Sequence, residues 1–202
     1  MNRFPAVLFD LDGVLVETYK AWFHLLNAAA THWGFPPIST EIYKDIWGQG
    51  IQADANRFFH GKSVPEVETF YREHFQDHRE HMITFPEGPE IFHLLREQNR
   101  GIAIITNTAR QQALEVLQIA GLKPDILVGG TDVPHSKPAP DMIYKACEEL
   151  NLSPEEVMVL GDSRYDREAA RAAGTYFVGM KTEGDDTVQN LSEFEKRFVS
   201  IP

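Results

Sequence analysis

Two aspartates separated by one residue, Asp10 and Asp12, are the first side chains in this sequence whose spacing could serve chemistry. Two carboxylates this close repel each other unless a cation or a shared proton relieves the repulsion. A hard divalent cation with oxygen ligands would relieve it. The pair therefore indicates a cation site, although both residues could also be simple turn formers ahead of Gly13.

A calcium-binding loop also begins with Asp-x-Asp, but it needs a third oxygen ligand before its glycine. Here Gly13 follows Asp12 directly, and the next three residues are the apolar Val14, Leu15 and Val16. The sequence therefore argues against a calcium loop.

The apolar run just before the pair, Ala6–Phe9, predicts the element that must position it. The run is too short for a helix and is typical of a strand buried on both faces, as in a parallel sheet. Ligands of open α/β sheets bind beyond the carboxyl ends of the strands. Asp10 and Asp12 would lie at that edge.

Polar side chains also follow three other predicted strands. Thr106 and Asn107 follow residues 102–105, Asp162 and Asp166 follow residues 157–160, and Lys137 lies in the loop after residues 126–128. Parallel strands share one carboxyl side, so we expect all of these side chains to converge. Each has a simpler explanation by itself, such as a helix cap, a turn or a solvated loop. Those explanations would have to hold at every strand at once.

Strands and helices alternate in the second half of the chain, which predicts an α/β fold with a doubly wound, Rossmann-like parallel sheet. The expected helices are residues 87–98, 109–120, 140–150 and 164–173, and a last strand is expected at 175–178. Between these, residues 153–156 carry a capping-box sequence for one short turn.

The segment between the first strand and residue 84 shows helical patterns and no strand-like run. Helices are expected near residues 18–33, 39–47, 51–59 and 65–81. We therefore predict two domains: an α/β core from residues 1–15 and 84–202, and a helical cap from residues 16–83 inserted after the first strand.

Composition narrows the class of partner and compartment. The 202-residue chain has a formal net charge of -11, which argues against binding a nucleic-acid backbone. Cys147 is the only cysteine, so an intrachain disulfide is impossible and a reducing compartment fits. The apolar run near Met1 is too short for a signal peptide, and no segment has transmembrane length. We expect a soluble, cytoplasmic protein with no membrane partner; the oligomeric state stays open.

Four short motifs follow one another along the chain: Asp10-Leu11-Asp12-Gly13, Ile105-Thr106-Asn107, Ser136-Lys137-Pro138 and Gly161-Asp162-Ser163-Arg164-Tyr165-Asp166. In this order they resemble the motifs of the haloacid dehalogenase (HAD) superfamily, and within it those of the branch of phosphoglycolate phosphatases and β-phosphoglucomutases. The resemblance covers nearly the whole chain, and it implies a HAD core whose small helical cap falls where the predicted helical block lies.

The resemblance also implies a role for each motif residue in a phosphatase. Asp10 would attack phosphorus to form an aspartyl phosphate, and Asp12 would donate and then accept a proton. Mg²⁺ would be the cofactor, and Thr106, Asn107 (through its main chain) and Lys137 would bind the phosphate of a small phosphorylated metabolite. The metal would be held by Asp10, the main-chain carbonyl of Asp12, Asp162 and, directly or through water, Asp166.

Two alternatives to hydrolysis stay open. The related mutases carry a histidine four residues after the threonine that follows their first motif; here that threonine is Thr18, the position holds Trp22, and His24 lies two residues further. A sugar-phosphate mutase is therefore the weaker alternative. A catalytically silent phosphate-binding module is the other, and the intact Asp10 and Asp12 argue against it. Asp12 also argues against a dehalogenase, because dehalogenases of the superfamily lack this second aspartate.

The helical segment offers weaker candidates for substrate contacts. The segment Trp47-Gly48-Gln49-Gly50 lies where this branch often has a specificity loop, but it could be a plain turn. Arg57 and Lys62 could bind an anionic substrate or be solvated. His74, His78 and His81 have a spacing that could bind zinc on one helix, although the charged residues around them favour a solvated face.

Overall fold

The structure, a computed structural model, describes residues 4–200. Residues 1–3 and 201–202 lie outside the described residues. The two ends of the predicted core domain, and the start of the segment considered as a signal peptide, therefore also lie outside them. Within residues 4–200, no helix combines the length and apolar character needed to cross a bilayer.

A parallel six-stranded sheet organises the fold, in the order β5-β4-β1-β6-β7-β8. The prediction of a doubly wound α/β fold is confirmed. The first strand of the chain is central, paired with β4 on one side and β6 on the other. The strands are β1 Ala6–Phe9, β4 Gly101–Ile105, β5 Ile126–Val128, β6 Val157–Gly161, β7 Tyr176–Met180 and β8 Asp186–Val188.

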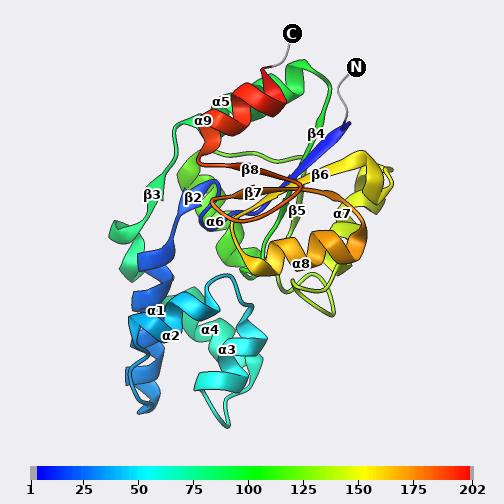
Figure 1. Ribbon diagram of the computed structural model, residues 1–202. Helices are drawn as coiled ribbons and strands as arrows, with labels where there is room; N and C mark the ends of the chain where they lie inside the picture. The colour runs from blue at the N-terminus through cyan, green and yellow to red at the C-terminus, as the bar shows by residue number, and fades with distance from the viewer. Residues whose placement is uncertain (1–3, 201–202) are drawn as a thin grey trace.

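Both faces of the sheet are covered, and the alternation of side chains along β1 shows how. Val7 and Phe9 belong to one buried cluster, which includes Phe92 of α5, whereas Ala6 and Leu8 belong to a second cluster around α7 and α8. Figure 1 shows α5 and α9 on one side of the sheet and α7 and α8 on the other. The helices of this part are α5 Glu87–Glu97, α6 Arg110–Ala120, α7 Asp141–Leu150, α8 Arg164–Ala173 and α9 Leu191–Phe194, with a 3₁₀ turn at Pro154–Glu156. Burial of successive β1 residues against opposite layers explains its continuous apolar sequence.

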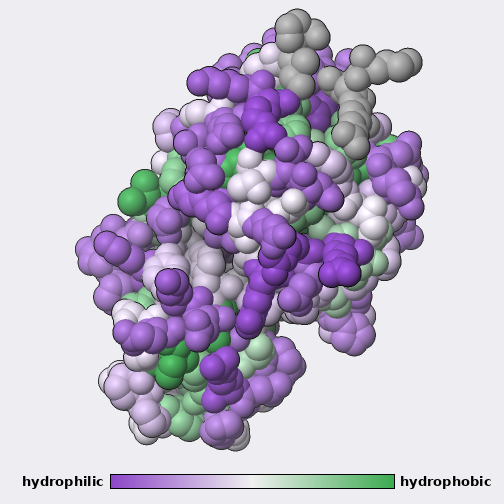
Figure 2. All heavy atoms as spheres, viewed as in Figure 1, coloured by the Kyte–Doolittle hydropathy of each residue, from purple (hydrophilic) through white to green (hydrophobic). Residues whose placement is uncertain are grey.

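A helical block occupies the chain between β1 and α5 and lies at the lower end of the molecule in Figure 1. A short antiparallel ribbon connects it to the sheet, with Val16 opposite Thr84. In Figure 2, hydrophilic side chains dominate the visible face of the upper part, whereas hydrophobic side chains lie among them on the helical block at the lower end. The block and its ribbon comprise β2 Val16–Glu17, α1 Tyr19–Trp33, α2 Thr40–Ile46, α3 Ile51–Phe58, α4 Val64–His74, the 3₁₀ helix Phe75–His81 and β3 Ile83–Thr84.

The prediction of one helix over residues 65–81 is wrong in its second half. The α-helix ends at His74 and the chain continues as a 3₁₀ helix. The buried ring of Phe75 packs on Trp22 of α1, with 4.9 Å between ring centroids. Tertiary packing at this point overrides the helical periodicity, and 3₁₀ turns are common at such helix ends.

The last part of the sheet extends beyond the predicted elements. The chain after the expected strand 175–178 adds β8, α9 and a short π-helical turn, Glu195–Val199. The three residues of β8 carry no apolar run, and their strand conformation depends on parallel pairing with β7, Val178 opposite Asp186. A local pattern therefore could not predict it.

Candidate active site

Lys137, in the loop after β5, contacts residues at or beyond the carboxyl ends of three other strands. Its Nζ lies 2.9 Å from Oδ1 of Asp10, after β1, and 2.6 Å from Oδ1 of Asp166, after β6. It also donates a hydrogen bond of 2.9 Å to the carbonyl oxygen of Ile105 at the end of β4. All three charged side chains are buried. The structure thus brings these sequence candidates into one centre at the carboxyl edge of the sheet.

Gly13 allows the loop after β1 to approach the loop after β6. Its φ of +81° lies in the left-handed region, and a Cβ there would overlap the carboxylate of Asp162. Only glycine meets both requirements. The glycine that follows the Asp pair is therefore needed for the close approach of the two loops.

Asp166 holds the start of α8 as well as Lys137. Its Oδ2 accepts hydrogen bonds from the Ser163 main-chain nitrogen at 3.0 Å and from Ser163 Oγ at 2.5 Å, while Ser163 Oγ accepts one from the Asp166 main chain. This reciprocal capping box fixes the carboxylate, so that Oδ1 faces Lys137.

An acidic cluster forms beside the lysine. Carboxylate oxygens of Asp10, Asp162 and Asp166 all lie within 4.8 Å of one another. Burial, followed by the negative charge of Asp166, raises the pKa of Asp10 well above its usual value, and Lys137 opposes this shift. Burial and Asp166 likewise raise the pKa of Asp162 to about 7. Oδ1 of Asp162 is buried and has no hydrogen-bond partner within residues 4–200. Crowded carboxylates with an unmatched oxygen fit a hard divalent cation such as Mg²⁺.

The side chain of Asp12 has different surroundings. Its Oδ1 accepts hydrogen bonds from Thr18 Oγ1 at 2.6 Å and from Trp22 Nε1 at 2.8 Å. Its Oδ2 accepts from Thr108 Oγ1 at 2.6 Å and from Thr106 Oγ1 at 3.3 Å. The side chain lies outside the acidic cluster, so of Asp12 only its main-chain carbonyl, which the family resemblance implies, remains a candidate metal ligand. Sequence analysis missed the contact made by Trp22.

Thr106 and Asn107 link the sheet edge to its surroundings. Asn107 Nδ2 donates to the carbonyl oxygens of Gly48, 2.8 Å away in the helical block, and Lys137, 2.9 Å away. Thr106 Oγ1 accepts a hydrogen bond from the main chain of Thr108 at 3.1 Å. The two residues therefore lie beside Asp12 and Lys137, where a bound anion would have to be held.

A second contact joins the helical block to the acidic cluster. Trp47, just after α2, donates a hydrogen bond of 2.9 Å from Nε1 to Oδ2 of Asp162. Trp47, Gly48 and Gln49 of the segment singled out by sequence analysis all line the cavity above the sheet edge. This segment thus lies directly on the candidate site.

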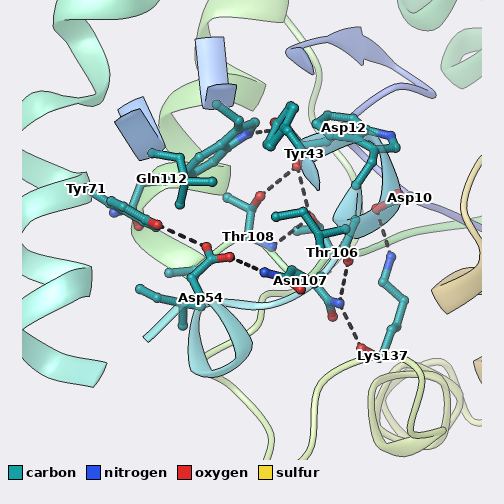
Figure 3. A pocket seen from close by; sticks show the side chains of 18 residues that line it. Asp10, Asp12, Tyr43, Asp54, Tyr71, Thr106, Asn107, Thr108, Gln112 and Lys137 are labelled. Carbon is teal, nitrogen blue, oxygen red and sulfur yellow. Dashed lines mark hydrogen bonds and ion pairs between the residues drawn. The ribbon is translucent and has the colours of Figure 1, made fainter. Parts of the chain in front are cut away.

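That cavity lies between the strand ends and the helical block (Figure 3). Asp54 of α3 forms part of its wall, and its carboxylate accepts hydrogen bonds from Gln49 Nε2 at 2.5 Å and Tyr71 Oη at 3.0 Å. Burial raises the pKa of Asp54 to about 7, against the effect of these two hydrogen bonds. Sequence analysis missed several side chains of this wall, namely Tyr43, Asp54, Tyr71 and Gln112.

The basic residues considered in the helical block lie elsewhere. Arg57 is exposed, with its guanidinium over the ring of Phe58, and Lys62 pairs with Glu66 at 3.2 Å. Neither lines the cavity.

The three histidines with helical spacing do not form a metal-ligating group. His74 lies 3.1 Å from Asp77, whereas His78 and His81 both stack on His24 of α1, with 6.1 Å and 4.3 Å between ring centroids. Within residues 4–200, the group whose ligand atoms lie close enough for a metal is the acidic cluster rather than these histidines.

Comparison with known proteins gives consistent matches. A family model described as haloacid dehalogenase-like hydrolase matches residues 7–180. The chain is 32% identical to a phosphoglycolate phosphatase of Chromobacterium violaceum, with 96% of each chain covered. It is also 32% identical to the pyrophosphatase PpaX of Bacillus cereus, covering 86% of this chain and 81% of that protein. The crystal structure of a hydrolase from Pseudomonas syringae matches in fold, with a TM-score of 0.84, 17% identity and coverage of 95% and 96%.

Proposed function

We propose that this chain, which belongs to the haloacid dehalogenase-like hydrolases and is a phosphoric monoester hydrolase similar to phosphoglycolate phosphatases, depends on Mg²⁺. It would hydrolyse a small phosphorylated metabolite through an aspartyl phosphate on Asp10. The observation that carries the proposal is the buried contact of Lys137 with Asp10 and Asp166, beside an acidic cluster and below a cavity.

Asp10 is the proposed nucleophile because two donors orient its carboxylate. Oδ1 accepts hydrogen bonds from the Leu11 main chain at 2.8 Å and from Lys137 at 2.9 Å, which leaves Oδ2 as the attacking atom. Oδ2 forms a bond to phosphorus as the bond to the leaving oxygen breaks. One hard step becomes two easier ones, since water then attacks phosphorus and releases Asp10.

Asp12 is the proposed acid and base. Protonated at the start, it gives its proton to the leaving oxygen, and it later takes one from the attacking water. The hydroxyl groups of Thr18 and Thr108 can rotate to donate to the carboxylate or accept from the carboxylic acid. These contacts support a residue that changes protonation state without moving.

Asp10, Asp162 and the main-chain carbonyl of Asp12 would hold Mg²⁺, with Asp166 binding directly or through water. When bound, the ion would neutralise negative charge on the attacking carboxylate and on the phosphoryl oxygens. The unmatched Oδ1 of Asp162 supports this assignment. Thr106, the Asn107 main chain and Lys137 would bind the remaining phosphoryl oxygens.

We also propose that residues 16–83 form a cap domain over a core made of residues 1–15 and 84–202. The narrow two-stranded connection supports this division. Hydrogen bonds from Trp47 to Asp162 and from Asn107 to Gly48 would hold the cap against the core. A cytoplasmic location is proposed from the single cysteine, Cys147, which is buried and unpaired.

Phosphate release from a panel of phosphorylated metabolites, with Mg²⁺ and with EDTA, tests the proposal. The panel includes phosphoglycolate, hexose phosphates, nucleotides and pyrophosphate, and Arg57→Ala serves as a control outside the cavity. We expect release that needs Mg²⁺ and survives Arg57→Ala. Conversion of a sugar phosphate to its isomer without release would support the mutase instead, and no turnover of any kind would favour a silent binding module.

A further inference from the structure

The charge and hydrogen-bonding character of the cavity wall identify a class of substrate. We infer that the leaving group is neutral and rich in hydroxyl or amide N–H donors, as in a sugar phosphate, and carries no second anionic group. The inference rests on the proposed phosphatase function and concerns the part of the substrate that remains after phosphate is removed.

The cavity wall lacks a positive charge to spare for a second anion. Among the described residues that line it, Lys137 is the only lysine, arginine or histidine. Lys137 is already bound to Asp10 and Asp166 at the sheet edge. A carboxylate or a second phosphate in the leaving group would therefore lose its hydration without gaining a cationic partner.

Asp54 makes the part of the wall that faces the leaving group unfavourable to anions. In Figure 3, Asp54 and Tyr71 lie on the side of the cavity opposite Asp10 and Lys137. The carboxylate of Asp54 repels an anion when it is ionised, and in neither protonation state does the group supply a positive charge to balance one. When ionised it accepts hydrogen bonds only, which suits a hydroxyl group of the substrate.

Three residues that line this same cavity each carry a buried polar atom for which the described part of the chain supplies no hydrogen-bond partner. The atoms are Tyr43 Oη, Asn107 Oδ1 and Gln112 Oε1. Buried polar atoms are normally paired, so an unmatched atom on a cavity wall indicates where a ligand group binds.

Asn107 shows which kind of group is missing. Its Nδ2 donates to the carbonyl oxygens of Gly48 and Lys137, and this orients the amide so that Oδ1 is an acceptor without a donor. A hydroxyl or an amide N–H can supply that donor, whereas a carboxylate or phosphate would oppose one acceptor with another. A site built for hydrogen-bond donors discriminates strongly against groups that lack them.

Relative turnover of neutral and anionic leaving groups tests this inference. With saturating Mg²⁺, kcat/KM is measured for hexose 6-phosphates, an N-acetylhexosamine 6-phosphate, phosphoglycolate and pyrophosphate. The reference is p-nitrophenyl phosphate, because its leaving group carries neither the hydroxyl groups of a sugar nor a second anionic group. We expect at least one neutral sugar phosphate to exceed both phosphoglycolate and pyrophosphate by about tenfold or more.

The inference and the proposed function fail in different ways. Higher kcat/KM for phosphoglycolate or pyrophosphate than for every sugar phosphate would overturn the inference and leave the phosphatase intact. Absence of Mg²⁺-dependent release from every compound, p-nitrophenyl phosphate included, would overturn both.

Two variants locate the effect in the wall. Gln112→Lys adds a cation, and we expect the ratio of kcat/KM for phosphoglycolate to that for the sugar phosphate to rise about tenfold. Tyr43→Phe keeps the ring and removes an unmatched hydroxyl, and it should lower kcat/KM for the sugar phosphate about fivefold more than for p-nitrophenyl phosphate. Lys62→Ala, outside the cavity, is the matched control. If Tyr43→Phe changes the ratio of kcat/KM for the sugar phosphate to that for p-nitrophenyl phosphate no more than Lys62→Ala does, the inference about the leaving group is wrong. This outcome can be read even if Gln112→Lys does not fold.

Discussion

The indole Nε1 of Trp22 donates a hydrogen bond of 2.8 Å to Oδ1 of Asp12. Thr18, one turn earlier, donates to the same oxygen at 2.6 Å. The start of α1 therefore holds the carboxylate that we propose as acid and base. An indole N–H donates a hydrogen bond but does not ionise near neutral pH, so Trp22 can orient Asp12 without serving as a second acid or base.

Trp22→Phe should lower kcat about tenfold, because a hydrogen bond to a charged group is lost while an aromatic ring is kept. The phenyl ring can still pack against Phe75, so the unfolding temperature should change little. Trp33→Phe, elsewhere on α1, is the control. Steady-state phosphate release at saturating substrate checks the effect, and equal kcat values for the two variants would contradict it.

Lys137→Met should destabilise the metal-free protein by about 3–5 kcal/mol, because it leaves the buried carboxylates of Asp10 and Asp166 without their cation. Mg²⁺ should recover part of the loss. The control is Lys145→Met, which removes a surface lysine paired with Glu149 on α7. Urea unfolding with and without Mg²⁺ measures the difference, and a loss no larger than in the control would show that the buried charges are balanced in another way.

Stability of the metal-free protein should fall as pH rises through about 7. The folded-state pKa of Asp162 and of Asp54 is raised from 3.8 to about 7, mainly by burial. The stability linked to these groups is fully present below their unfolded pKa and is lost as pH rises through the folded value.

Thermal unfolding in EDTA from pH 5 to pH 8 checks this pH dependence. Asp54→Asn should flatten part of the decline, whereas Asp45→Asn, at an exposed position on α2, should follow the wild type. A wild-type unfolding temperature that rises across this range would contradict the prediction.

The residues at the sheet edge could be predicted from sequence because each directly follows a short apolar strand. Parallel strands bring their carboxyl ends to one edge, so the positions of Asp10, Thr106 and Asp162 followed from topology. The family resemblance added the order of the motifs. Lys137 lies further from its strand, and only tertiary structure shows that it is buried between two aspartates.

The cavity wall could not be predicted in the same way. Asp54 and Tyr71 come from different helices and meet only because α3 packs on α4. The sequence offered one clue, the polar Gln112 beside Ala113 and Val116 of the predicted apolar helix face. The structure shows that Gln112 is buried on that face of α6. A polar side chain in such a position often faces a cavity or a ligand, but the sequence does not show which.

The most direct test of the central proposal is to trap the phosphorylated enzyme. The protein is mixed with radiolabelled p-nitrophenyl phosphate and Mg²⁺, quenched in acid during turnover, and digested for peptide mapping. We predict a label on the peptide that contains Asp10, released by hydroxylamine as expected for an acyl phosphate, and absent in EDTA and in Asp10→Asn. Phosphate release at the full rate without any labelled peptide, or the same label in Asp10→Asn, would contradict nucleophilic attack by Asp10.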